Sequence, residues 1–580
     1  LMSIYLSRPW TKMYDPGAPA SLEPYPTGAM HQQLEKTATE NGHKVACITS
    51  APLPLLGRVG ATVTWGEINA AAARMAAGLA AAGIEKGDVV AIIMPNCVQF
   101  IVAFYAILKA GGIISATNPT YPPAKMAEQI NDSGAKCVIA LSMFYRPFKS
   151  VQSQTQVQTV VVTRFKEYLP GAARALFTLA KEKKSAHYLP ALESGDMWFQ
   201  DLLAQHSPAD QPSISIDAAE DIAIYQYTGG TTGVPKGAMS THRALVANTY
   251  TMQCWLPSED PSAEVLLAAI PFFHVYGLVA IVAYAASAAA SVIIVPNARD
   301  VDDLLGNMVR WQPTIFMGVP ALFNALNNHA DVKSGKADLT LLRVCFSGSA
   351  PLAPDTKRRF EKLATTTIVE GFGMSEAPTA SHGNPLGRPG KEQSVGVPFP
   401  DTDCRIVSVD DGVTDMPVGE AGELIMRGPN TMKGYLNMPE ETDNALRDLG
   451  DGGPPWLYTG DIAYMDEDGY FFIVDRKKDM ALIGGFNVYP TAVEKVLADH
   501  PDVQEVGVTR IPHPEKEGQE ALLACVVLQP GQSVSVEDLI EFQSQKVAPH
   551  EIARRVAFLD ELPKTAVGKT LRRDLAQTAG

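Results

Sequence analysis

Short apolar runs alternate with longer helical segments in the first quarter of the chain. The run 88–94 is apolar after its first residue, and 113–116 is nearly so. Segments of helical periodicity lie before and between them, at 66–82 and 98–110, and each ends at glycine. Together with a short strand at 62–65, this order predicts a parallel sheet with helices on both faces.

The same alternation resumes over residues 263–367 and then changes. From about residue 401, short strands of alternating polarity separated by glycine turns appear, for example at 404–409 and 422–427. Such a pattern predicts a small β-barrel, since each strand has one face for a core and one for solvent.

A charged run at 475–478 marks the next change in pattern. After it, helices and strands mix in a compact arrangement to the end of the chain. We therefore expect an α/β fold with a large N-terminal domain, residues 1–475, made of two α/β subdomains and the small β-barrel. A small, mobile α+β C-terminal domain, residues 476–580, follows it.

A glycine- and threonine-rich run, Tyr227 to Gly237, follows an apolar strand at 222–225 and precedes an expected helix start at 240–246. The loop is thus expected between a strand and a helix. Its four glycines allow close approach of backbone N–H groups to a ligand, its three threonines add hydroxyl donors, and Lys236 adds a charge. These features suit a polyphosphate, although the loop alone also fits a flexible surface segment. Because Gly237 follows Lys236, it is not a Walker A loop.

Composition narrows the class of protein. The 580 residues are 46% hydrophobic and 19% charged, which is typical of a folded chain of at least two domains. The net charge of −15 argues against nucleic-acid binding and gives no overall attraction to anionic lipid. Seven cysteines are scattered singly, without zinc spacing, so we expect free thiols and a cytoplasmic location.

Two segments bear on membrane contact. Residues 278–295 approach the length of a membrane span but are alanine-rich and interrupted by serines, so a buried helix followed by a buried strand is expected. Residues 173–184 form an amphipathic pattern with a basic end. An ordinary surface helix is the first interpretation and a peripheral contact at the inner membrane the second. The sequence leaves that contact and a homodimer open.

Eight motifs then occur in a fixed order, and together they resemble the adenylate-forming enzymes: acyl-CoA synthetases, peptide-synthetase adenylation domains and beetle luciferases. Within that superfamily the likeness is to bacterial long-chain fatty acyl-CoA synthetases, particularly over 227–243, 318–326, 473–480 and 485–490. The eight motifs are 227–237, 271–277, 347–352, 370–376, 394–398, 458–461, 475–479 and 563–569.

The resemblance implies an activity. A fatty acid would be activated with ATP and Mg²⁺ to acyl-AMP with release of pyrophosphate, and then transferred to coenzyme A with release of AMP. A fatty acyl-AMP ligase, which passes the adenylate to a carrier protein, is the alternative enzyme. A nucleotide-binding scaffold without catalysis is the alternative of a different class. The resemblance does not give the length of the acyl chain.

The resemblance also implies residue roles in binding ATP. Glu376 would hold the magnesium, Asp461 and Arg476 the ribose, and Lys569 would bridge the acyl carboxylate and the α-phosphate. Catalysis would depend on Lys569, Glu376, Thr231 and Lys236. The phosphate-binding residues would be Thr228, Gly229, Gly230, Thr231, Thr232, Gly233 and Lys236. The adenine-binding segments would be Gly348, Ser349 and Ala350, with Glu370, Gly371, Phe372, Gly373, Met374 and Ser375.

A second group of residues would serve the acyl and CoA channel and the movement between domains. Lys478 occupies the hinge position. Phe372 replaces a usual tyrosine, Ser375 a usual threonine, and Leu482 stands where luciferases carry lysine, which argues against luciferase chemistry. The channel residues would be His274, Gly318, Val319, Gly484, Gly485 and Phe486.

Overall fold

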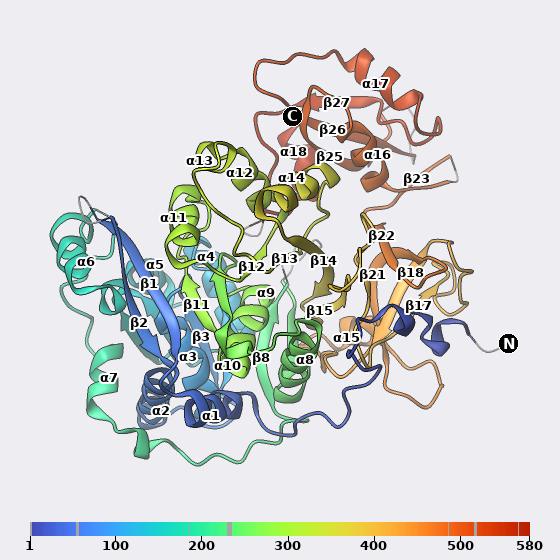
Figure 1. Ribbon diagram of the computed structural model, residues 1–580. Coiled ribbons are helices and arrows are strands. Elements are labelled where there is room, and N and C mark those ends of the chain that lie inside the picture. Colours follow the sequence, from blue (N-terminus) through green and yellow to red (C-terminus); the bar gives the residue numbers. More distant parts are fainter. Residues whose placement is uncertain are drawn as a thin grey trace.

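The computed structural model describes residues 3–53, 57–184, 186–228, 235–484, 486–514, 519–565 and 568–579. In Figure 1 two sheets with their helices make up the larger part of the molecule, from blue to yellow. A third sheet, in orange, lies beside them, and the C-terminal residues, in red, form a separate small unit. This arrangement confirms the expected α/β fold with a large N-terminal and a small C-terminal part.

Nine strands form the first sheet in the described part of the chain, in the order β16-β15-β14-β13-β12-β10-β11-β1-β2. The strands from β14 to β1 are parallel, and the outer pairs are antiparallel. Their bounds are β1 Val45–Leu53, β2 Gly57–Thr64, β10 Val265–Ala268, β11 Ser291–Ile294, β12 Ile315–Gly318, β13 Val344–Ser347, β14 Thr367–Met374, β15 Ala377–Gly383 and β16 Val397–Pro398.

Eight strands, counted over the described residues, form the second sheet in the order β19-β9-β8-β4-β3-β5-β6-β7. Here β8 to β7 are parallel, while β9 and β19 are antiparallel additions. The strands are β3 Val89–Ile93, β4 Ile113–Ala116, β5 Cys137–Leu141, β6 Thr159–Thr163, β7 Met197–Trp198, β8 Ile222–Tyr227, β9 Gly237–Thr241 and β19 Gly434–Tyr435.

One hydrophobic core lies between the two sheets. On β3, Val90 and Ile92 face this core, whereas Val89 and Ile93 face helices on the other side. Every residue of α3 is buried, which explains why its sequence is apolar all round. The helices of this inner core are α1 Met30–Asn41, α2 Trp65–Ala81, α3 Val98–Lys109, α7 Phe199–Gln205, α8 His242–Trp255, α9 Val275–Gly277 and α10 Tyr284–Ala288.

Other helices cover the outer faces of the sheets. Their apolar sides pack on the sheet residues that point away from the inner core. On the first sheet these are α11 Val301–Trp311, α12 Pro320–Asn328, α13 Ala330–Lys333 and α14 Pro354–Ala364. On the second they are α4 Pro123–Ser133 and α5 Ser142–Gln152. Shorter helices connect elements: η1 Tyr5–Ser7, η2 Pro9–Met13, η3 Phe165–Tyr168, α6 Gly171–Leu176, η4 Phe177–Lys181, η5 Pro208–Asp210 and η6 Pro261–Ala263.

Local signals explain where several elements begin. Thr64 caps α2 by accepting from the backbone N–H of Glu67 at 3.2 Å, and Glu67 accepts from the N–H of Thr64 at 2.7 Å. The alanine-rich segment 278–295 forms η7 (Leu278–Ala283), a π-helix, then α10 and β11. Its helical part is almost wholly buried, as expected. In the described residues, no helix is both long and apolar enough to span a bilayer.

The expected order around the glycine- and threonine-rich loop is wrong in one respect. The loop joins β8 to a second strand, β9, and helix α8 begins only after that strand. Tyr227 pairs with Gly237, so the loop closes a β-hairpin. Residues 237–241 form a strand that is paired on both edges, on one side with β8 and on the other with β19. Thr241, rather than Ser240, caps α8.

The third sheet stands where the sequence predicts a small barrel. It is antiparallel, in the order β17-β18-β21-β20 with β22 also on β21, and no pairing among the described residues closes it into a ring. Its elements are β17 Asp403–Val407, β18 Gly422–Arg427, α15 Pro439–Ala445, β20 Leu446–Arg447, β21 Trp456–Met465 and β22 Phe471–Arg476.

The C-terminal unit follows β22 after a three-residue turn. A hairpin and a three-stranded sheet, counted within the described ranges, carry its own two small cores. Its elements are β23 Ala481–Ile483, β24 Phe486–Val488, α16 Pro490–Ala498, β25 Val503–Pro512, β26 Glu520–Leu528, α17 Val536–Ser544, β27 Arg555–Phe558 and α18 Arg572–Thr578.

The hairpin formed by β14 and β15 leaves no room for a side chain at Gly373. A Cβ there would lie 1.4 Å from the carbonyl oxygen of Thr379. We predict that Gly373→Ala costs about 1–3 kcal/mol through overpacking and lowers the midpoint of thermal unfolding by a few degrees. Gly171→Ala is the control, because nothing lies within 4 Å of a Cβ at that position. Equal midpoints for the two variants, measured by scanning calorimetry, would contradict the close approach.

Candidate active site

Three parallel strands of the first sheet end side by side where the predicted nucleotide motifs lie. Gly318 at the end of β12 pairs with Ser347 at the end of β13, and Ser347 pairs with Glu370 of β14. Open α/β sheets bind ligands at this carboxyl edge, because the loops there leave a crevice. The predicted segments brought together at this edge are 318–319, 348–350 and 370–376.

The ring of Tyr276 joins the predicted channel to these strand ends. Its hydroxyl lies within hydrogen-bonding distance of the carbonyl oxygens of Gly318 (3.5 Å) and Phe346 (3.4 Å). A Cβ on Gly348 would lie 3.4 Å from the same ring. Ser349 follows with a positive φ of 71°, so the chain turns sharply there. Tyr276, two residues after His274, thus packs where the adenine-binding and channel segments meet.

Lys236 lies at the C-terminal end of the predicted phosphate loop. The backbone N–H of Thr228 donates to the carbonyl of Lys236 at 3.0 Å, which closes the neck of the hairpin. The Lys236 ammonium forms an ion pair with Glu441 of α15 and lies 5.1 Å from the ring centre of Tyr435. The loop residues Gly229, Gly230, Thr231, Thr232 and Gly233 lie outside the described residues, so their predicted contacts stay predictions.

Glu376 lies in the turn between β14 and β15. Tyr435 donates its hydroxyl hydrogen to Glu376 Oε1 at 2.7 Å, and the backbone N–H of Met432 donates to the Glu376 carbonyl at 2.8 Å. In the described residues no group of three or more His, Cys, Asp or Glu side chains could hold a metal by itself. Magnesium characteristically takes one or two carboxylates and completes its shell with phosphates and water, so a single glutamate fits a metal that arrives with ATP.

Asp461 and Arg476 form an ion pair between β21 and β22, in which the carboxylate is buried and the guanidinium is partly exposed. Arg476 Nε lies 2.7 Å from Asp461 Oδ1, and the Asp461 side chain is only 4% exposed. Burial raises the pKa of Asp461, while Arg476 and Lys569 act to lower it. Among the described residues Asp461 Oδ2 has no hydrogen-bond partner. A buried acceptor of this kind suits a bound hydroxyl pair such as a ribose diol.

Lys569 lies near the same pair, although more than 90 residues separate them in sequence. Burial, with repulsion from Arg476 and Arg572, lowers the pKa of Lys569 to about 8, against attraction from Asp461 and Asp479. The preceding Gly568 approaches the N-terminal part directly, since a Cβ on it would lie 3.7 Å from the Cβ of Ala321 in α12. The structure therefore brings the C-terminal lysine to the ribose-binding candidates.

Two further predicted residues, His274 and Lys478, have pKa values that depend on the same charged side chains. Burial, with repulsion from Lys569, lowers the pKa of His274 to about 4, so the ring is neutral near pH 7. Its Nδ1 accepts from the backbone N–H of Tyr276 at 3.2 Å and caps α9. Lys478 lies in the turn after β22. Burial lowers its pKa, with Arg476 and Lys236 acting in the same direction and Asp479 and Asp461 in the opposite one.

Not every predicted residue contributes its side chain to this cluster. The Glu370 carboxylate forms an ion pair with Lys357 of α14 at 3.1 Å and is 10% exposed. Phe372 packs edge to face on His382, with ring centres 5.7 Å apart. Met374 is buried in the core beside the third sheet. Glu370 therefore supports the strand rather than offering a free acceptor to a nucleotide.

The described CoA-channel residues predicted in the C-terminal unit, Gly484 and Phe486, lie in the β23–β24 hairpin. Gly484 lies in the β23–β24 turn with a positive φ of 61°, and Gly485 falls outside the described residues. Phe486 is 56% exposed and stacks on His550, with ring centres 4.3 Å apart. Figure 1 shows β23 at the edge of the C-terminal unit. In this arrangement the channel role of these residues stays a prediction.

Sequence reasoning missed Tyr435 and Glu441, which hold Glu376 and Lys236. Both come from 433–445, a segment outside the eight motifs. Tyr435 reaches the site because β19 pairs with β9, Tyr435 opposite Ala238. A two-residue strand gives no periodic signal. The only signal in the sequence was the acidic start of the helix at 439–445, with Glu440 and Glu441 in its first turn.

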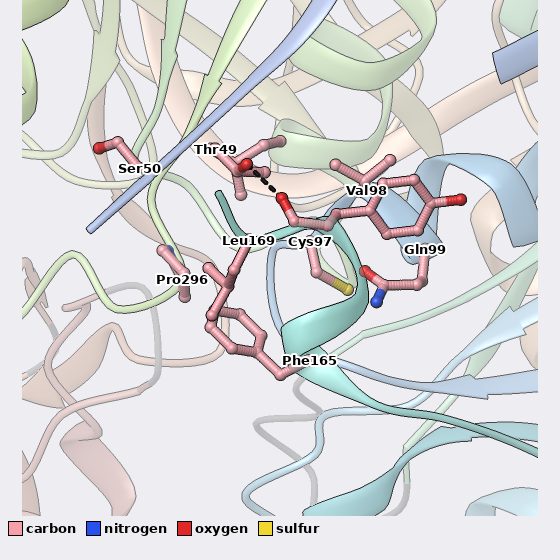
Figure 2. Close-up of a pocket in the computed structure, with 10 residues that line it drawn as sticks. Thr49, Ser50, Cys97, Val98, Gln99, Phe165, Leu169 and Pro296 are labelled. Atoms are coloured by element: carbon pink, nitrogen blue, oxygen red, sulfur yellow. Dashed lines mark hydrogen bonds between the residues drawn. The ribbon is translucent and has the colours of Figure 1, made fainter. Parts of the chain in front are cut away.

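A small crevice of about 20 Å³, partly open to solvent, lies elsewhere in the large domain. Figure 2 shows Thr49 donating to the carbonyl of Tyr168 at its wall. None of its residues belongs to the predicted nucleotide or channel segments, so it is not the site of the charged cluster. Its lining consists of Thr49, Ser50, Cys97, Val98, Gln99, Phe165, Tyr168, Leu169, Ile294 and Pro296.

Comparison with known families agrees with this geometry. Residues 34–436 match the model of the AMP-binding enzyme family, and residues 492–569 match that of the AMP-binding enzyme C-terminal domain. The chain belongs to the AMP-binding enzyme family. The predicted membership of the adenylate-forming superfamily is thereby confirmed, and the turn that carries Lys478 lies between the two matches, which end at 436 and begin at 492.

Individual relatives extend the likeness over the whole chain. A long-chain-fatty-acid–CoA ligase of Bacillus subtilis strain 168 is 36% identical over 570 residues, covering 98% of both chains. An enzyme of the same name from Salmonella typhimurium is 34% identical, covering 99% of both. The crystal structure of ATP-bound MatB from Rhodopseudomonas palustris has a TM-score of 0.80 at 27% identity, covering 95% of this chain and 98% of that one.

If Lys569 contacts ATP as predicted, its lowered pKa should make the affinity for ATP depend on pH. The pKa is lowered from the ordinary 10.5 to about 8, so the ammonium loses its charge as the pH rises through 8. We predict that ATP binding, measured by titration calorimetry between pH 7 and 9.5, weakens up to tenfold per pH unit above 8. In Lys569→Met this dependence disappears. An ATP affinity in the parent protein that stays constant up to pH 9.5 would contradict the assignment.

The hydroxyl of Tyr435 allows a second prediction. Tyr435→Phe keeps the ring beside Lys236 but removes the hydrogen bond that orients Glu376. Groups that orient a metal-binding carboxylate are typically worth 10–100-fold in metal affinity. We expect the magnesium concentration for half-maximal tightening of ATP binding to rise about tenfold. Tyr5→Phe, which loses a hydroxyl bond to the Met416 carbonyl instead, is the control. The same magnesium dependence in both variants would exclude this role.

Proposed function

We propose that this AMP-binding enzyme activates a fatty acid with ATP to acyl-AMP and then transfers the acyl group to coenzyme A. The observation that carries the proposal is the meeting of Lys569 with the Asp461–Arg476 pair, close to Lys236 and Glu376. The acceptor Asp461 suits a ribose, and the cations suit phosphates and a carboxylate. The names of the relatives support fatty acid and CoA as substrates.

In the first step a carboxylate oxygen of the fatty acid forms a bond to the α-phosphorus of ATP. The bond from that phosphorus to the pyrophosphate oxygen breaks, and pyrophosphate leaves. The acid is already ionised near pH 7, so the step needs no general base. The barrier arises from bringing two anions together, and the positive charge of Lys569 would lower that barrier. Asp461 and Arg476 would hold the ribose so that the α-phosphate faces the acid.

Magnesium bound with ATP neutralises phosphate charge, and Glu376 is the residue that would hold it. Tyr435 keeps Glu376 Oε1 in a fixed direction, so the other carboxylate oxygen would be the one to bind the metal. When ATP binds, Lys236 would leave its ion pair with Glu441 and contact the β- and γ-phosphates instead. Glu441 thereby keeps the ammonium near the loop before ATP arrives.

In the second step the sulfur of coenzyme A attacks the acyl carbonyl carbon. The bond from that carbon to the phosphate oxygen breaks, AMP leaves, and the thiol proton passes to solvent. We propose that residues 476–580 turn as a small domain on 1–475 about Lys478 between the steps. Lys569 would then withdraw and Gly484, Gly485 and Phe486 would approach the channel. Phe486 is exposed in the present arrangement, and this supports its proposed approach to the channel after the small domain has turned.

The acyl group would enter between His274 and the segment Gly318–Val319. The neutral imidazole supports a gate for an apolar chain rather than a charged contact. We propose a long-chain fatty acid, on the strength of the relatives' names. The exposed side chains of Leu176 and Leu179 beside Arg174 support a peripheral membrane contact as the source of such an acid. That contact and a homodimer stay predictions.

The experiment is CoA-dependent release of AMP from ATP and magnesium, measured across fatty acids of increasing length. Turnover should be restricted to one class of chain length. Lys569→Ala should lower it several hundredfold, because a charge aimed at the transition state is lost. The matched control is Lys564→Ala, which removes only a surface ion pair with Glu505 from the same segment.

Two other outcomes would replace the proposal. Accumulation of acyl-AMP without any thioester would indicate a fatty acyl-AMP ligase that uses a carrier protein. Binding of ATP without turnover on any acid would indicate the non-catalytic scaffold. Equal loss of activity in Lys564→Ala and Lys569→Ala would show that the segment, rather than the Lys569 ammonium, is required.

A further inference from the structure

Arg572, the first residue of α18, contacts groups on both sides of the proposed hinge. Its Nη1 lies 2.5 Å from Asp475 Oδ1 at the end of β22 and 3.4 Å from Asp479 Oδ2 in the turn beyond it. Nη2 and Nε donate to the two oxygens of Glu494 on α16, at 2.7 and 3.1 Å, and Nη2 also donates to Thr491 Oγ1 at 2.5 Å. One guanidinium therefore joins three carboxylates from three elements.

These contacts lie largely out of water. The Asp475 side chain is 1% exposed and that of Arg572 17%. Exposed ion pairs contribute little, because water screens them and both side chains lose freedom. A shielded guanidinium with several charge-assisted hydrogen bonds instead holds a fixed geometry. The network can therefore set the position of the segments it joins.

Two short stretches of backbone connect this network to the proposed reacting groups. Asp475 Oδ1, which accepts from Arg572, also accepts from the backbone N–H of Arg476 at 2.7 Å. Arg476 is the partner of Asp461. On the other side, Lys569 lies three residues before Arg572. The guanidinium thus links the strand that carries the Asp461–Arg476 pair to the segment that carries Lys569.

We propose that Arg572 is a positioning residue for adenylate formation, which holds Lys569 against the Asp461–Arg476 pair; this rests on the function proposed above. Lys569 has to reach ATP from a unit joined to the large domain by one turn, so its own side chain cannot fix its place. Arg572 anchors that segment through Asp475. Transfer to CoA makes no use of Lys569, so that step does not need the anchor.

Lysine cannot replace arginine in this role. A planar guanidinium presents five donors in a fixed fork and reaches Asp475 and Glu494 together, whereas an ammonium is a compact point charge. Arg572→Lys therefore keeps the charge but loses the bridge. Arg510→Lys is the matched control, since Arg510 makes a half-exposed ion pair with Glu520 in the same unit.

The test separates the two half-reactions of the full-length protein. Adenylate formation is followed by exchange of pyrophosphate into ATP with a fatty acid, and transfer by supplying acyl-AMP and CoA. In Arg572→Lys we expect exchange to fall at least tenfold while transfer stays within twofold and the unfolding midpoint within about two degrees. A parallel loss of both half-reactions and of thermal stability, or an unchanged exchange rate, would overturn the proposal.

A second measurement does not depend on turnover. The rate at which an amine reagent modifies Lys569, followed by mass spectrometry against pH, reports its titration. If Arg572 holds Lys569 in the cluster, Arg572→Lys, which keeps the positive charge but loses the bridge, should move that titration from about pH 8 towards the ordinary value of 10.5, while Arg510→Lys leaves it in place. An unchanged titration in Arg572→Lys would overturn the positioning role. Absence of exchange in the parent protein would instead contradict the proposed function alone.

Discussion

A carboxylate that is almost completely buried, Asp461, sets the arrangement around it. Taking a carboxylate out of water is unfavourable unless cations and donors surround it. Arg476 supplies one oxygen with a partner at 2.7 Å, and Lys569 approaches from the C-terminal unit. The second oxygen has no partner in the described part of the chain. The two large sheets and the third sheet thus converge on an acceptor that a ligand can complete.

The elements that bring these groups together are held by different forces. The large sheets are fixed by a core of apolar side chains on both faces, so the strand ends at Gly318 and Ser347 are rigid. The C-terminal unit has its own small cores and is fastened near the site through ionic contacts, chiefly those of Arg572. Ion pairs can break and be replaced by other contacts, and this suits a unit that is proposed to move between the two steps.

Apolar periodicity predicted the buried helices and parallel strands well, because their burial leaves a repeating signal. The boundaries of α3 and β4 agree with the expected segments within a residue. β9 was missed because its five residues, Gly-Ala-Met-Ser-Thr, show no alternation of apolar and polar positions, and its pairing with β19 is distant in sequence. Motif resemblance singled out Asp461, Arg476 and Lys569, and the structure pairs Asp461 with Arg476, while their roles towards a nucleotide stay predictions. It could not show that Glu370 is paired with Lys357, or that Tyr435 and Arg572 support the cluster, since those contacts arise from the fold.

A crystal structure with a hydrolysis-resistant acyl-adenylate, in which a sulfamate replaces the phosphate, tests the central claim most directly. The account predicts both ribose hydroxyls on Asp461, the sulfamate beside Lys569 and the acyl chain leading past His274. Adenosine bound elsewhere, or an Asp461 carboxylate that keeps one oxygen unpartnered in the complex, would contradict the assignment of this cluster as the place where the adenylate forms.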